Sequence, residues 1–124
     1  MLKDLRIIYL EDEELIKESV ERTVSKFIKE LVSFTNPIEA LEFIENSDRK
    51  FDLIITDIQM PRMNGLDFIR ELKSKNIDIP IVVITAFNTE EHLQACEELE
   101  VEEVITKPVN LIDLFNKIEN ICSK

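Results

Sequence analysis

The acidic residues Glu11, Asp12 and Glu13 follow one apolar stretch of the chain, and Asp57 follows another. Carboxylates that lie close together repel one another, which raises their pKa values or draws in a cation. Mg²⁺ prefers oxygen ligands and keeps water or phosphate oxygens for its remaining positions. If the fold joins these acids, they form a metal site. Taken alone, the first three are equally typical of a solvated turn that begins a helix, where acids favour the helix dipole.

Asp57 ends a run of apolar or small residues, LIIT at 53–56. A charge at the end of a buried strand needs a compensating interaction. A carboxylate in such a position can attack a phosphoryl group as a covalent nucleophile, which gives an acyl phosphate. The plainer interpretation is an aspartate that only caps a loop.

Thr85 and Lys107 end two further β-branched runs, and both suit an anionic ligand. The ammonium group of Lys107 is a compact point charge for an anionic oxygen, and without phosphate it could pair with Asp57 or Asp12. The Thr85 hydroxyl can donate a hydrogen bond to a phosphoryl oxygen. Taken alone neither residue specifies a site, and Thr is a common strand former.

Short strands that alternate with helices would position these residues. Dense, β-branched apolar runs predict buried strands at residues 5–10, 31–34, 51–56, 81–85 and 103–106. Helical spacing predicts helices at 38–45, 66–73 and 90–99. Two apolar stripes predict the first and last helices: Ile16, Val20, Val24 and Phe27, and Leu111, Leu114, Phe115, Ile118 and Ile121. Pro37 suits the start of the second helix, and Asn110 can cap the last.

Strand and helix alternate five times in this pattern, which indicates an α/β protein with a parallel sheet. Five units favour an open, doubly wound sheet over a barrel. In such sheets the functional crevice lies at the carboxyl ends of the strands. Four of the five strand ends carry chemically capable side chains, whereas the second, TNP at 35–37, offers little.

The composition narrows the class of protein. A length of 124 residues fits one domain, and 44% hydrophobic residues is ordinary for a folded globular protein. The net charge of −11 disfavours nucleic acid and anionic membranes as direct partners. No signal peptide or membrane-spanning segment is visible. Cys96 and Cys122 form no C-x-x-C pair, so we expect two reduced cysteines packed in or near the core of a cytoplasmic protein.

The single glycine, Gly65, disfavours nucleotide sites built on glycine-rich loops, since these need several glycines at fixed spacing. Its neighbour is Asn64, and Asn-Gly predicts a tight turn with a positive φ just before the third helix.

Four short signatures stand at the strand ends: YLEDE at 9–13, DIQMPRMNG at 57–65, TA at 85–86 and KP at 107–108. In this order they resemble the receiver domains of two-component response regulators, whose acceptor motif reads D-x-x-M-P-x-M-[DN]-G. The resemblance runs from Leu5 to the last helix. It implies one receiver domain over residues 1–124, with a flavodoxin-like fold of five parallel strands in the order 2-1-3-4-5 and five helices.

The resemblance also implies a function: a phosphorylation-controlled conformational switch in a phosphorelay, not an enzyme, although it assists its own phosphorylation and dephosphorylation. Asp57 would accept a phosphoryl group from a sensor histidine kinase or a phosphotransfer protein. Thr85 and Lys107 would hold the phosphoryl oxygens. Such a reaction asks for alignment and charge neutralisation more than for covalent help.

A divalent cation, Mg²⁺ or Mn²⁺, is the cofactor that the resemblance implies. Asp12 and Asp57 would ligate it by their side chains, and Glu11 directly or through a water. The backbone carbonyl of Gln59 would complete the protein ligands.

The sequence departs from the family pattern at two places. The family often has Asp-Asp where this chain has Glu11-Asp12, which should preserve metal binding. Three residues before the strand-end lysine the family usually has Tyr or Phe, whose ring moves with the threonine, but this chain has Val104. Phe87 is a candidate substitute for that ring, and Gln59 and Phe87 occupy positions that tune phosphoryl lifetime in the family.

Two alternatives remain open at this stage. Val104 suggests the first alternative, an interaction module that has a receiver fold but acts without phosphate. A small phosphatase with an aspartyl nucleophile is the other, but it would need a second aspartate where this chain has Gln59. The sequence names neither the kinase nor the downstream partner.

Overall fold

Five parallel strands form one sheet in the computed structural model, which describes residues 2–60, 62–86 and 89–123. The strand order is β2-β1-β3-β4-β5, which confirms the predicted order. The strands are β1 (Arg6–Leu10), β2 (Glu30–Phe34), β3 (Leu53–Asp57), β4 (Ile81–Thr85) and β5 (Glu103–Thr106). Their bounds match the predicted strands to within two residues.

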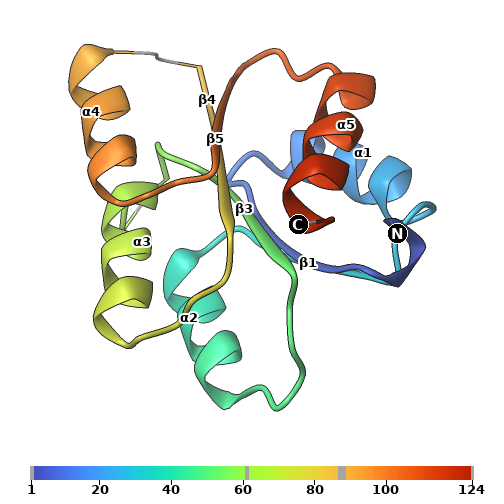
Figure 1. Cartoon of the computed structure of the whole chain (residues 1–124), viewed down its shortest axis with the longest axis horizontal. Coiled ribbons are helices and arrows are strands. Elements are labelled where there is room, and N and C mark those ends of the chain that lie inside the picture. Colours follow the sequence, from blue (N-terminus) through green and yellow to red (C-terminus); the bar gives the residue numbers. More distant parts are fainter. Residues whose placement is uncertain (1, 61, 87–88, 124) are drawn as a thin grey trace.

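Helices cover both faces of the sheet (Figure 1). They are α1 (Glu14–Val24), α2 (Pro37–Asn46), α3 (Gly65–Ser74), α4 (Glu90–Glu98) and α5 (Leu111–Cys122), and a short 3-10 turn spans Leu2–Asp4. Helices α1 and α5 lie on one face, and α2, α3 and α4 lie on the other (Figure 1). This is the doubly wound arrangement that alternating strands and helices predict.

The alternation of side chains along β1 shows how the two layers are built. Ile8 and Leu10 join the core cluster under α2, α3 and α4. Ile7 and Tyr9 join the cluster under α1 and α5. Successive strand residues point to opposite faces, so a strand covered on both sides must be apolar at consecutive positions.

The first helix ends earlier than its apolar stripe predicted. Helix α1 ends at Val24, and Phe27 lies in the turn that follows, 51% exposed, with its ring centroid 5.1 Å from that of Phe115. The backbone N–H groups of Lys29 and Glu30 already donate to Leu5 O, which begins the pairing of β2 with β1. The helix must therefore end before Phe27, although the helical spacing of the stripe continues.

Side chains cap several of the helices. Asn36, Asn64, Thr89 and Asn110 each accept a hydrogen bond from a backbone N–H in the first turn of α2, α3, α4 and α5. Pro37 is the first residue of α2. Both the proline start and the Asn110 cap agree with the sequence analysis.

The positive φ predicted for the Asn-Gly pair is wrong. Asn64 caps α3 with a φ of −75°, and Gly65 has no positive φ; Arg62 carries it instead, at 73°. Gly65 is required for space, because a Cβ there would lie 2.1 Å from the backbone oxygen of Asp57. The pair thus joins α3 closely to the end of β3.

Both cysteines lie in or near the core, as the composition predicts. Cys96 is buried, Cys122 is half-buried, and both are free thiols. Among the helices of residues 2–60, 62–86 and 89–123, none has both the length and the apolar character to cross a membrane.

Candidate functional site

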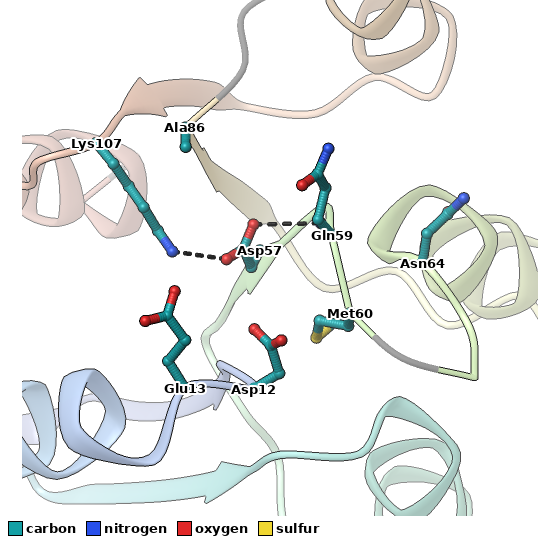
Figure 2. Close-up of a pocket in the computed structure, with 8 residues that line it drawn as sticks. All are labelled: Asp12, Glu13, Asp57, Gln59, Met60, Asn64, Ala86 and Lys107. Atoms are coloured by element: carbon teal, nitrogen blue, oxygen red, sulfur yellow. Dashed lines mark hydrogen bonds and ion pairs between the residues drawn. The ribbon is translucent and has the colours of Figure 1, made fainter.

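The carboxyl ends of the strands surround a pocket of about 500 Å³ (Figure 2). In Figure 2, Lys107 and Asp57 point toward each other, with Asp12 and Glu13 on the side of the β1–α1 turn. The pocket is lined by Asp12, Glu13, Asp57, Gln59, Met60, Asn64, Ala86 and Lys107. Residues from four loops therefore meet at the edge where parallel sheets carry their functional sites.

Asp57 is the centre of this pocket. It is the last residue of β3 and is only 6% exposed. Its Oδ2 accepts a hydrogen bond from Lys107 Nζ at 2.7 Å, and its Oδ1 accepts one from the backbone N–H of Gln59 at 3.3 Å. A buried carboxylate held by a cation and a backbone donor is compensated in the way that such a charge requires.

Glu11 lies directly after β1 and is 1% exposed. Its Oε2 accepts from the backbone N–H of Glu13 at 3.3 Å, and its Oε1 accepts from Tyr9 Oη at 3.4 Å and lies 3.2 Å from Lys107 Nζ. Burial raises the pKa of the Glu11 carboxyl above its usual value, and the charge of Lys107 opposes that rise. The carboxylate is thus paired at a cost in desolvation.

Lys107 joins the two buried acids. Lys107 comes directly after β5. Its backbone N–H donates to Thr85 O at 2.8 Å, and the peptide bond between Lys107 and Pro108 is cis. Burial lowers the pKa of the Lys107 ammonium, but the hydrogen bond to Asp57 and the charges of both acids outweigh it and raise the pKa. Of the two partners considered from sequence, Asp57 is the one found; the second partner is Glu11, not Asp12.

Three acids come close enough to share a cation. Each of Glu11, Asp12 and Asp57 offers a carboxylate oxygen, and these atoms all lie within 4.8 Å of one another. Oxygen ligands of this kind fit a hard divalent cation such as Mg²⁺. Glu13 lines the pocket but is not part of this group.

The other predicted site residues take different places. Gln59 lines the pocket. Thr85 is 1% exposed, and the register pairs Asp57 with Ile84, so Thr85 lies one residue beyond Asp57 on the adjacent strand. Val104 is half-buried and packs against the core under α2, α3 and α4. Phe87, considered for ring coupling and for phosphoryl lifetime, lies outside the described residues, as does Pro61 of the acceptor motif.

Several residues without a predicted role in the site also lie here. Met60, Asn64 and Ala86 line the pocket, and Tyr9 supports Glu11. The signal for Tyr9 was present, because residues two apart on a strand share a face and Tyr9 is a hydroxyl-bearing residue in an apolar run.

We expect replacement of Lys107 by Met to destabilise the protein by about 3 kcal/mol near pH 8, the lower end of the cost of breaking a buried ion pair. Without the ammonium the folded-state pKa of Glu11 rises further, so the folded state binds its proton more tightly than the unfolded state. Protonation of Glu11 therefore stabilises the folded variant at low pH, and this stabilisation is lost as the pH rises through the folded-state pKa of Glu11. The deficit should therefore be smaller at about pH 5 than at about pH 8.

Urea unfolding at both pH values measures this effect. Lys117→Met is the matched control, because Lys117 pairs with Glu103 and Asp113 on the surface. Its loss should cost about 0.5 kcal/mol or less. A deficit in Lys107→Met that is the same at both pH values contradicts the assignment of the buried acids as its cause.

Comparison with known proteins gives a consistent family. Residues 7–119 match the response regulator receiver domain. The chain is 33% identical over 115 residues to the response regulator MprA of Mycobacterium leprae, covering 92% of this chain and 49% of that protein. It is 31% identical over 116 residues to the regulatory protein VanRB of Enterococcus faecalis, covering 93% and 51%. The chain thus spans about half the length of these curated relatives.

Solved structures agree with the fold. The non-phosphorylated HemR receiver domain from Leptospira biflexa has 25% sequence identity and a TM-score of 0.84, with 98% of this chain and 96% of that chain covered.

Proposed function

Because this chain belongs to the response regulator receiver domain family, we propose that it is a signalling switch that takes a phosphoryl group on Asp57. The observation that carries the proposal is the environment of that carboxylate. Asp57 is buried at the end of β3, 2.7 Å from Lys107 Nζ, within the group of acids that includes Glu11 and Asp12. A nucleophile, a cation for the phosphoryl oxygens and a set of metal ligands are then in one pocket.

A divalent cation, Mg²⁺ or Mn²⁺, is the cofactor we propose for this pocket. Asp12 and Asp57 would hold it by their side chains, Glu11 directly or through a water, and Gln59 by its backbone carbonyl. Bound there, the cation supplies charge neutralisation for the transferring phosphoryl group.

The phosphoryl donor is proposed to be a phosphohistidine on a sensor histidine kinase or a phosphotransfer protein. A carboxylate oxygen of Asp57 forms the new O–P bond while the N–P bond breaks, and the electron pair of that bond stays on the imidazole nitrogen. Lys107 and Thr85 hold the phosphoryl oxygens in the product. Since Lys107 already donates to Asp57, its ammonium needs only a small movement to reach a phosphoryl oxygen.

The domain organisation, partner class and cellular compartment of the switch are part of the same proposal. We propose that residues 1–124 act as one receiver domain, and that phosphorylation shifts an existing two-state equilibrium toward a surface for a protein partner. The net charge of −11 argues against nucleic acid or an anionic membrane as the direct partner of this segment. Two free cysteines fit a reducing compartment such as the cytoplasm.

Intact mass after incubation with acetyl phosphate tests the proposal. With Mg²⁺ present we expect a gain of one phosphoryl group, and with the chelator EDTA we expect none, because three acids close together repel an incoming phosphate without a cation. Lowering the pH in the quench should preserve the acyl phosphate, and hydroxylamine should remove it.

The outcome separates the proposal from its alternative. A modification that resists hydroxylamine excludes an acyl phosphate, and one that forms to the same extent without metal contradicts the proposed role of the cation. No gain from acetyl phosphate or from a cognate kinase would favour the phosphate-independent module, to which Val104 draws attention. In that case partner binding should be the same with Asp57→Asn.

A further inference from the structure

Tyr9 stands behind the acidic group, on the side away from the acceptor pocket. It lies on β1 among the apolar residues under α1 and α5 and is 2% exposed. Tyr9, Glu11 and Lys107 all line a second cavity of about 590 Å³, which is not the pocket that contains Asp12 and Asp57. Lys107 lines both cavities, whereas Glu11 lines the second one. The Tyr9 hydroxyl therefore contacts Glu11 on the side of the second cavity.

The donors to Glu11 differ in how they respond to a cation. Lys107 Nζ lies 3.2 Å from Glu11 Oε1, but it is charged and is shared with Asp57. An arriving divalent cation repels this ammonium. The Tyr9 hydroxyl, 3.4 Å from the same oxygen, is neutral, and among the described residues it donates to Glu11. It can keep its bond while the cation is bound.

We propose that Tyr9 is a positioning residue whose hydroxyl holds the Glu11 carboxylate within the acidic group, in position to bind a divalent cation directly or through a water. This inference rests on the proposed function, since it assigns a role toward the cation of that site. Hydrogen bonds to metal ligands from the surrounding residues fix ligand orientation, and their loss weakens metal affinity.

The choice of tyrosine at this position supports the inference. Phenylalanine would fill the same core space without a polar group to satisfy. A hydroxyl buried to this degree costs free energy unless it is hydrogen-bonded, and Glu11 supplies that bond. Burial and the negative charge of Glu11 raise the pKa of Tyr9 far above its ordinary value, so the hydroxyl remains a donor.

Mn²⁺ binding measured by electron paramagnetic resonance tests this role. Free Mn²⁺ gives the signal, so the bound fraction follows from a titration of the protein, and Mg²⁺ competition gives the second affinity. We expect Tyr9→Phe to weaken the affinity for both ions about tenfold, the low end for loss of such a supporting hydrogen bond, because 3.4 Å is a long bond. Thermal unfolding of the metal-free protein shows whether the variant is folded.

A double-mutant cycle with Glu11→Gln separates positioning from a general effect on structure. If Tyr9 acts through Glu11, adding Tyr9→Phe to Glu11→Gln causes no further loss of affinity. The same tenfold loss in both backgrounds, or an unchanged affinity in Tyr9→Phe, overturns the inference while leaving the proposed function standing. A wild-type protein that binds neither ion overturns both.

Tyrosine fluorescence gives an independent readout, because the chain contains one Tyr and no Trp. The tyrosine emission of this protein therefore reports on Tyr9 alone. We expect Mg²⁺ to change the emission of the wild type in a saturable way and to leave that of Glu11→Gln unchanged. A response that is the same in both proteins overturns the link between Tyr9 and Glu11.

Discussion

Replacement of Asp57 by Asn should leave no detectable phosphoryl incorporation from acetyl phosphate in the presence of Mg²⁺. The amide oxygen is a poor nucleophile, and the neutral side chain removes one of the three negative charges of the acidic group. The variant should remain folded, because Glu11 still lies 3.2 Å from Lys107 Nζ and keeps that ammonium paired. Intact mass gives the incorporation, and thermal unfolding confirms the fold.

Asp67→Asn is the matched control for this experiment. Asp67 lies on α3, is exposed, and pairs with Arg70 at 2.8 Å on the surface. The same chemical change there should leave incorporation at the wild-type level. A phosphoryl group on Asp57→Asn would place the acceptor on another acid, and peptide mapping of Asp12 and Glu11 would identify it.

The substitution Gly65→Ala, which adds one methyl group, should destabilise the protein by about 3 kcal/mol, the upper range for overpacking. Its Cβ would meet the backbone oxygen of Asp57 at 2.1 Å and Ile58 Cα at 2.9 Å, and backbone atoms cannot rotate away. The backbone N–H of Gly65 also donates to Ile58 O at 2.7 Å, so α3 is held against the end of β3. To admit the methyl group, this bond must lengthen or Asp57 must shift.

This destabilisation is opposite in sign to the effect that Gly→Ala ordinarily has in a helix. Alanine favours helix over glycine by about 1 kcal/mol in an exposed interior. Glu71→Ala, at an exposed position of the same helix, serves as the control and should change stability by about 0.5 kcal/mol or less. Urea unfolding measures both variants. A Gly65→Ala protein as stable as the wild type would contradict the close contact between α3 and β3.

A second readout links this contact to the site. If Gly65→Ala folds, Asp57 should be displaced at its backbone, and phosphoryl incorporation per folded molecule should fall as well. The matched Glu71→Ala protein should incorporate at the wild-type rate.

Local patterns were enough to predict most of the fold. The strand 81–85 and the strand 103–106 have the predicted bounds, and the helices from 37 onward begin and end within one residue of prediction. These elements are specified by residues close in sequence, because the side-chain periods of two and 3.6 reveal which face is buried. The strand order needed more than these periods, and it came from the resemblance to a family.

Errors occurred where a distant contact decides the local structure. Phe27 continues the helical stripe of α1, but pairing of β2 with β1 through Leu5 ends the helix at Val24. The Asn64-Gly65 pair predicts a positive φ, but the approach of α3 to β3 uses the small size of Gly65 instead. In both cases a tertiary contact, with Leu5 in the first and with the end of β3 in the second, overrode the local preference.

The sequence by itself determined the types of chemistry that the site offers: three acids, a lysine and a buried threonine at strand ends, in the order typical of receiver domains. Only the tertiary structure decided how they pair. Lys107 lies between Asp57 and Glu11, and Tyr9 reaches Glu11 from the other side. The physical reason is that spacing along the chain predicts which strand end carries a residue, whereas distances between atoms on different strands depend on register, burial and the side-chain conformations that the packed core allows.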